Sequence, residues 1–170
     1  MRAAPAPSVR TLEERVAALE AVEAIKALKH RYLRACDLKD AETLRDCFVA
    51  EGASIDYGPA GAFEGADLLT DLYRKVALAK HDGRYVVLDM HHAVHPVIEL
   101  LGDGRAKGAW TLRFRQVDRV ERTEKVSAIE YDDRYEVEDG RWLIRSSHVK
   151  VLWQLTRPLP EGFSIRGAFA

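Results

Sequence analysis

The sequence has little cysteine, no long apolar run and no excess of either charge. Its only cysteines, Cys36 and Cys47, are too few for a disulfide framework, and their spacing matches no zinc motif. Basic and acidic residues number 26 and 27, so electrostatics gives no reason to expect nucleic acid or an anionic membrane as a partner. The apolar stretches are far shorter than a membrane span, and residues 1–8 lack the apolar core of a secretory signal. We therefore expect a cytoplasmic protein with two buried, reduced thiols.

Motifs that bind cofactors or form covalent intermediates are also missing. There is no glycine-rich phosphate loop, no nucleophile elbow and no zinc signature. The segment His91-His-Ala-Val-His95 has three histidines, but this spacing on a strand does not bring three rings to one metal ion. We expect neither a cofactor nor a metal.

The residues that are present predict one domain, because 47% of them are apolar and can build a single core. We expect a flexible tail over residues 1–10, the domain over 11–156 and a C-terminal extension over 157–170. Thr11 and Glu14 form a capping-box pattern before a long helix that reaches about Lys39. The first two turns of this helix also resemble a short coiled-coil seam, which fits either an oligomer contact or packing on the helix's own domain. Apolar residues recur along the helix at steps of three and four: Leu12, Val16, Leu19, Val22, Ile25, Leu28 and Tyr32.

Short elements follow, and then the pattern changes to strands. We expect a helix over 41–49 with Asp40 as its N-cap, strands at 53–57 and 63–65, a helix over 66–79 and a loop at 81–84. Four β segments near 85–100, 105–120, 123–138 and 141–156 predict an antiparallel meander that curls strongly. Helices first and sheet afterwards indicate the α+β class. Alternating Val149, Val151 and Trp153 predict an apolar sheet face that is buried in a homodimer or homotrimer.

Several segments resemble the SnoaL-like family of the nuclear-transport-factor-2-like superfamily. They are IKALKHRYLRACDLKD at 25–40, FEG at 63–65, HHAVH at 91–95, YDDRY at 131–135 and DGRWLI at 139–144. The resemblance implies a cone-shaped half-barrel, in which N-terminal helices pack over a curved sheet and the mouth holds a small apolar or aromatic molecule. Such cones serve dehydratases, isomerases, hydrolases, cyclases and non-catalytic binders, so the fold alone does not give the activity.

Within this family the chain is similar to scytalone dehydratase and bile-acid 7α-dehydratase. The resemblance places Asp37 and His91 where both enzymes have functional residues, and it matches Tyr32 and Tyr57 to tyrosines that one or the other uses. The sequence also departs from both patterns, because Trp110, Ile129, Tyr131 and Phe114 replace polar site residues of the two enzymes. Neither substrate can therefore be transferred to this chain.

The residues themselves favour a catalytic pair. Asp37 lies near the C-terminal end of a helix, where a negative charge is disfavoured, and its apolar neighbours suggest that it points inward. The alternative is an exposed carboxylate at the following turn.

His91 and His92 point to opposite faces of their strand, so only one reaches the cavity, and the resemblance favours His91. Strict alternation gives His95 the same face as His91. A purely structural His91 is the alternative to a group that transfers a proton.

Aromatic side chains supply the expected binding surface. Tyr32 and Tyr57 can donate hydrogen bonds to a substrate oxygen, with core aromatics as the alternative. Trp110 can stack on a planar ring, and Tyr131 and Phe114 can line the same wall. Two further polar residues stay ambiguous: Asp133 lines the cavity or is structural, and His148 faces the pocket or an interface.

These residues predict a cofactor-independent lyase that uses His91, Asp37 and Tyr32 on a hydroxylated aromatic or polycyclic substrate. The reaction would be a dehydration or a retro-aldol-like elimination. One alternative is an isomerase that moves a proton next to a carbonyl, which leaves the substrate's mass unchanged. The other is a non-catalytic binder, for which Asp37 and His91 would be too far apart to cooperate or the cavity would be filled.

Overall fold

A computed structural model describes residues 11–167 and 169, so the tail expected at 1–10 lies outside the described residues. The N-terminal elements are α1 (Leu12–Leu38), α2 (Ala41–Arg45), β1 (Ser54–Asp56), the 3-10 helix η1 (Gly58–Ala60), β2 (Ala62–Glu64) and α3 (Ala66–Ala77). The strands that follow are β3 (Lys80–His81), β4 (Arg84–Tyr85), β5 (Val87–Gly102), β6 (Arg105–Asp118), β7 (Thr123–Glu138) and β8 (Arg141–Pro158).

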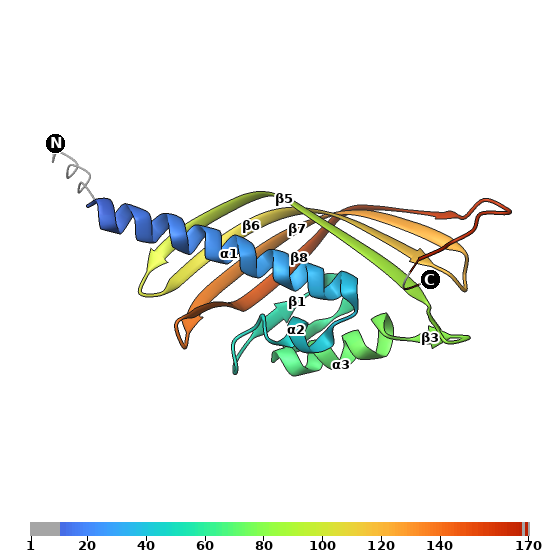
Figure 1. The fold of residues 1–170 in the computed structure, drawn as a ribbon, viewed down its shortest axis with the longest axis horizontal. Helices are drawn as coiled ribbons and strands as arrows, with labels where there is room; N and C mark the ends of the chain where they lie inside the picture. The colour runs from blue at the N-terminus through green and yellow to red at the C-terminus, as the bar shows by residue number, and fades with distance from the viewer. Residues whose placement is uncertain (1–10, 168, 170) are drawn as a thin grey trace.

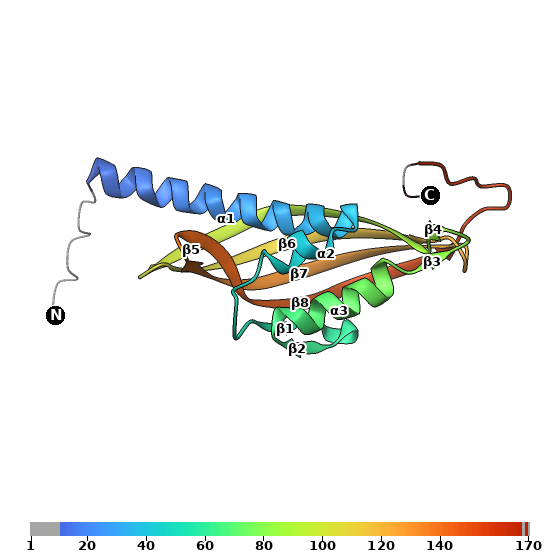
Figure 2. The same cartoon turned by 60° about the horizontal axis from the view of Figure 1, so that its bottom comes forward.

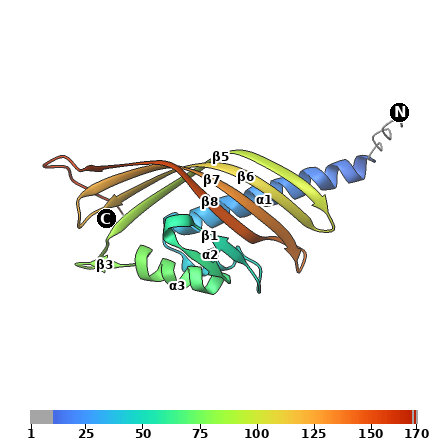
Figure 3. The same cartoon turned by 180° about the vertical axis from the view of Figure 1, so that it is seen from behind.

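The main sheet has the order β2-β1-β8-β7-β6-β5 and is antiparallel except between β1 and β8. It curves strongly, and α1 crosses one of its faces while α2 and α3 lie below its β1 end (Figures 1 and 2). We call this the helix-covered face and the opposite one the back face, which is seen in Figure 3. The expected α+β class and curved, mostly antiparallel sheet are confirmed, and the sheet does not close. Among the described residues, no helix is long and apolar enough to cross a membrane.

Helix α1 is fixed at both ends by local hydrogen bonds. The Thr11 hydroxyl accepts from the Glu14 N–H at 3.2 Å, and the Glu14 carboxylate accepts from the Thr11 N–H at 2.8 Å, which is the expected capping box. The helix ends at Lys39, whose φ of 63° lets its N–H donate to the last free carbonyls. Only the later turns pack on the sheet, from Ile25 onward. The seam residues of the first turns stay exposed: Leu12, Val16 and Leu19.

Two of the short elements differ from the expectation. Helix α2 ends at Arg45 rather than near 49, because the Ile144 N–H donates to the Cys47 carbonyl and the Val49 N–H donates to the Ile144 carbonyl. These bonds turn the segment into a bridge alongside β8. The loop expected at 81–84 is a tight hairpin between β3 and β4, in which Asp82 and Gly83 both have positive φ.

A bulge in β8 overturns the expected stripe of Val149, Val151 and Trp153. Val151 pairs with Ile129, but Trp153 pairs with the adjacent Ala128, so one extra residue stands between them. An extra residue reverses the alternation of side chains along a strand. Val149 and Val151 therefore share the helix-covered face, and Trp153 lies on the back face.

A second irregularity separates His95 from His91. The pairing of β5 with β6 shifts between Val94 and Val97, and His95 adopts a φ of 54°. His95 consequently does not continue the alternation from His91, and the prediction that they share a face is wrong.

The centre of the domain contains a fully buried ion pair. The Lys29 ammonium of α1 donates to the Asp133 carboxylate of β7 at 2.8 Å, and both side chains are 0% exposed. Ser147 and Tyr135 each donate a hydroxyl hydrogen bond to the same carboxylate at 2.8 Å. The Trp110 indole N–H in turn donates to the Tyr135 hydroxyl at 2.9 Å. Asp133 is thus a structural residue, one of the two alternatives that the sequence left open.

Burial lowers the pKa of Lys29, while the neighbouring Asp133 charge opposes that shift. An ion pair of this kind is costly to break from one side, because the remaining charge stays in the core without a partner.

We expect Asp133→Asn to lower the free energy of unfolding by about 3–5 kcal/mol, since it leaves the Lys29 ammonium buried and unpaired. Urea denaturation measures the loss. Asp132→Asn is the matched control, because Asp132 is exposed and Arg134 is its one ion-pair partner among the described residues. The double variant Lys29→Met with Asp133→Leu should recover part of the stability. Equal unfolding energies for the Asp133 and Asp132 variants would contradict the central role of the pair.

Candidate active site

The C-terminal end of α1 places a carboxylate directly on a histidine of the sheet. The Asp37 Oδ1 lies 2.6 Å from the His91 Nδ1, and the backbone N–H of His91 donates to both carboxylate oxygens at 3.1 and 3.2 Å. The side chains are 22% and 14% exposed, so the pair is sheltered but accessible. The structure therefore brings together the two residues that the sequence selected as a catalytic pair.

This contact fixes the proton on the imidazole. An ionised carboxylate only accepts hydrogen bonds, so the Nδ1 of His91 carries a proton, and in the neutral imidazole the Nε2 is then the nitrogen with the lone pair. Within residues 11–167 no hydrogen bond occupies that Nε2. The ring packs against Phe114, with 4.7 Å between the ring centroids. His92 is exposed on the other side of the strand, so His91 is the histidine that faces the helix.

A second ion pair anchors the same end of the helix. The Lys39 ammonium contacts the Asp89 carboxylate, and both side chains are almost completely buried. Gln116 donates to the other oxygen of Asp89 at 2.9 Å. Because Lys39 follows Asp37 on the helix and Asp89 precedes His91 on β5, the two contacts hold helix and strand in one register.

The tyrosines Tyr32 and Tyr57 lie against each other. Their hydroxyl oxygens are 2.6 Å apart, so one phenol donates to the other and the acceptor keeps its own O–H for another partner. Burial raises the pKa of Tyr32 well above its ordinary value, and burial also raises the pKa of Tyr57. Both phenols are neutral donors at neutral pH. No hydrogen bond described for this chain links them to His91 or Asp37.

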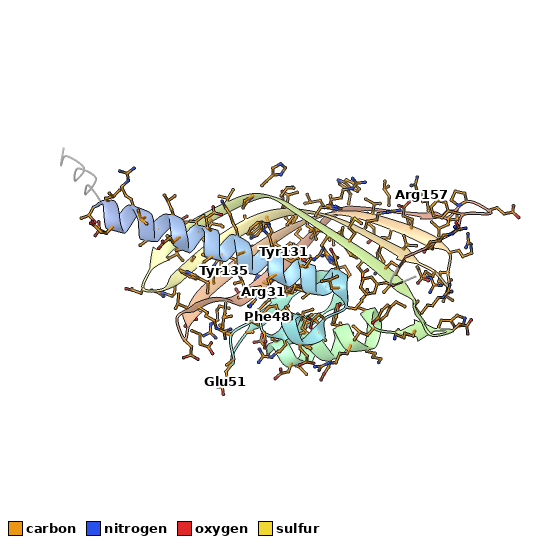
Figure 4. All side chains as sticks on the ribbon, viewed as in Figure 1. Arg31, Phe48, Glu51, Tyr131, Tyr135 and Arg157 are labelled. Carbon is orange, nitrogen blue, oxygen red and sulfur yellow. The ribbon has the colours of Figure 1, made fainter. Side chains whose placement is uncertain are left out.

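Two of the expected binding residues are enclosed by the protein itself. Trp110 is 2% exposed and bonded to Tyr135, and Tyr131 is 6% exposed. The Lys29 ammonium lies 3.5 Å from the centroid of the Tyr131 ring. Figure 4 shows Tyr131 and Tyr135 alongside α1. The side chains of Trp110 and Tyr131 therefore leave little surface for a ligand to contact, whereas Phe114 beside His91 is only half-buried.

Sequence reasoning missed the polar residues that extend the site across the sheet. Phe114 pairs with Ser127 on β7, and Ser127 pairs with Gln154 on β8. The neighbouring Gln116 pairs with Lys125. Alternation along each strand was visible in the sequence, but the strand register that joins these residues to His91 was not.

A separate hollow of about 620 Å³ lies on the back face. Its lining includes His95, Thr111, His148 and Lys150, and also parts of Trp110 and Tyr131, two of the predicted binding residues. His148 is thereby placed away from the Asp37–His91 pair. Among the described residues, no group of three histidine, cysteine or carboxylate side chains is arranged to hold a metal ion.

Both cysteines are free and buried, as expected. Burial raises the pKa of the Cys36 thiol to about 12, so this thiol is not a nucleophile at neutral pH.

Solved structures with the same architecture include proteins named for elimination reactions. A protein from Novosphingobium aromaticivorans, provisionally named scytalone dehydratase, has 18% identity and a TM-score of 0.73, covering 87% of this chain and 97% of its own. A type 2 hexachlorocyclohexane dehydrochlorinase (LinA) has 17% identity and a TM-score of 0.74, covering 88% and 99%. A Mycobacterium tuberculosis protein of unknown function has 20% identity and a TM-score of 0.66, covering 85% and 78%. At these identities the likeness is one of fold.

The family comparison covers most of the domain. The model of the SnoaL-like domain matches residues 17–148, which include most of α1, the Asp37–His91 pair and the sheet as far as the first half of β8. Together with the curved half-barrel, this match shows that the chain belongs to the SnoaL-like domain family.

Proposed function

We propose that this protein is a cofactor-independent lyase, which eliminates water or another small group from a hydroxylated aromatic or polycyclic substrate. The observation that carries the proposal is the 2.6 Å contact between Asp37 and the Nδ1 of His91, which leaves the Nε2 free to accept a proton. A base oriented in this way is suited to general acid–base catalysis near neutral pH.

In the proposed reaction, the Nε2 of His91 removes a proton from a carbon next to an electron-withdrawing group. The electron pair of the broken C–H bond forms the new double bond as the leaving group departs from the adjacent carbon. Asp37 stabilises the imidazolium that forms and keeps the ring in place. The same imidazolium then gives its proton to a departing hydroxide, so that water leaves and the base is restored.

The two phenols have a supporting role in this proposal. Negative charge develops on a substrate oxygen when the proton is removed, and a donor in a low-dielectric site stabilises it. Tyr32 is 3% exposed, so the half-buried Tyr57 would offer its O–H to the substrate while Tyr32 donates to Tyr57. Phe114 would contact the planar part of the substrate, with Trp110 and Tyr131 supporting the wall from the core. The names of the dehydratase and dehydrochlorinase neighbours favour an elimination over an isomerisation.

We expect His91→Ala to lower turnover by roughly two to four orders of magnitude, the usual contribution of general acid–base catalysis. Hydroxylated aromatic and polycyclic ketones would be screened, and products identified by mass spectrometry. His92→Ala is the control, because His92 lies on the same strand with its side chain on the opposite face. Near wild-type turnover by the His91 variant would refute the mechanism. A product of unchanged mass would indicate an isomerase, and ligand binding without turnover a non-catalytic binder.

We expect the free energy of unfolding to fall as the pH rises above about 10, the ordinary tyrosine pKa. The folded protein holds the phenol protons of Tyr32 and Tyr57 above that pH, whereas the unfolded chain releases them, so alkali favours unfolding. Urea titrations at a series of pH values measure the slope. The double variant Tyr32→Phe with Tyr57→Phe should show a shallower decline. An identical decline in the two proteins would contradict the raised pKa values.

A further inference from the structure

A strip of polar and aromatic side chains continues from His91 across the helix-covered face. The strand register aligns His91 with Phe114, Ser127 and Gln154 in one row. The adjacent row contains Asp89, Gln116, Lys125 and Thr156. These residues alternate in phase with the core residues Leu112 and Ile129, so their side chains share the face on which α1 lies.

Lys125 is the cation of this strip. Its ammonium lies 5.7 Å from the centroid of the Phe114 ring, and that ring is 4.7 Å from the ring of His91. The order along the face is therefore imidazole, aromatic ring and ammonium. A planar substrate lying on Phe114 would reach both the imidazole and the ammonium.

Among the described residues Lys125 has no carboxylate partner, and its ammonium contacts only the face of Phe114 described above. Lys29 pairs with Asp133 and Lys39 pairs with Asp89, both in buried contacts. Within the described part of the chain, no ion pair involves Lys125, although its side chain is half-buried. A half-buried ammonium near the catalytic pair, without a carboxylate of its own, is a suitable binding group for an anion.

We infer that Lys125 binds an anionic group of the substrate, a carboxylate or a phenolate, while Phe114 supports its planar ring system. This inference rests on the proposed function, because it assigns the substrate class to the same site. The preferred substrates are aromatic or polycyclic acids rather than neutral ring compounds. In the adjacent row Ser127 is buried and donates to Gln154 at 3.4 Å, so the exposed Gln154 is the group that can take a further polar substituent.

The test compares two probes, hydroxynaphthoate and its methyl ester, which share the ring system but differ in charge and by one methyl group. Their affinities for the wild-type protein and for Lys125→Met are measured by isothermal titration calorimetry. We expect the wild type to bind the acid about fivefold more tightly than the ester, the worth of a partly exposed ion pair. Lys125→Met should bind the two probes equally, with the affinity for the ester unchanged.

Lys150→Met is the matched control, because Lys150 lies on the back face and lines the other hollow. It should keep the preference for the acid. The inference is overturned if the wild type shows no preference or binds neither probe, if Lys125→Met keeps the preference, or if Lys150→Met loses it.

The same titration on His91→Ala separates this inference from the proposed catalysis. That variant should show the strongly reduced turnover predicted above and still prefer the acid. A wild-type enzyme that eliminates a neutral compound but shows no preference for the acid would leave the lyase proposal intact and refute the role of Lys125. Conversely, a preserved preference for the acid without turnover of any substrate would refute only the catalytic proposal.

Discussion

The architecture depends on how one helix is joined to the sheet by charge. The Lys29–Asp133 pair fixes the middle of α1 to β7, and the contacts of Asp37 and Lys39 fix its end to β5. Sliding or rotating the helix would separate these buried charges from their partners, which is strongly unfavourable. The geometry of the candidate catalytic pair is therefore a consequence of the same contacts that position the helix.

The helix and the pair were predictable from the sequence because both follow from short-range rules. A three- and four-residue apolar period gives the inward face of α1, and Asp37 falls beside that face near the helix end. Alternation places either His91 or His92 on the helix-covered side. The family resemblance then decided between the two histidines, a choice that the residues alone did not make.

The wrong predictions, which concern the faces of Trp153 and His95, came from irregular pairing between strands. One extra residue at Leu152 moves Trp153 to the other face, and the shift after Val94 does the same to His95. The β8 irregularity contains neither glycine nor proline, whereas the β5 irregularity contains Pro96, a local signal that the alternation rule did not take into account. The row that joins Phe114 to Ser127 and Gln154 was hidden for the same reason, since register is a property of two strands and not of one.

At Lys39 the backbone conformation favours glycine, whereas the ion pair with Asp89 requires a lysine side chain. Its left-handed conformation costs a non-glycine residue roughly 1–2 kcal/mol, which glycine would avoid. Glycine, however, has no ammonium to neutralise Asp89. The strained backbone of this turn is thus retained because the Lys39 ammonium neutralises Asp89. No single amino acid at this position between α1 and α2 would both relieve the backbone strain and neutralise Asp89.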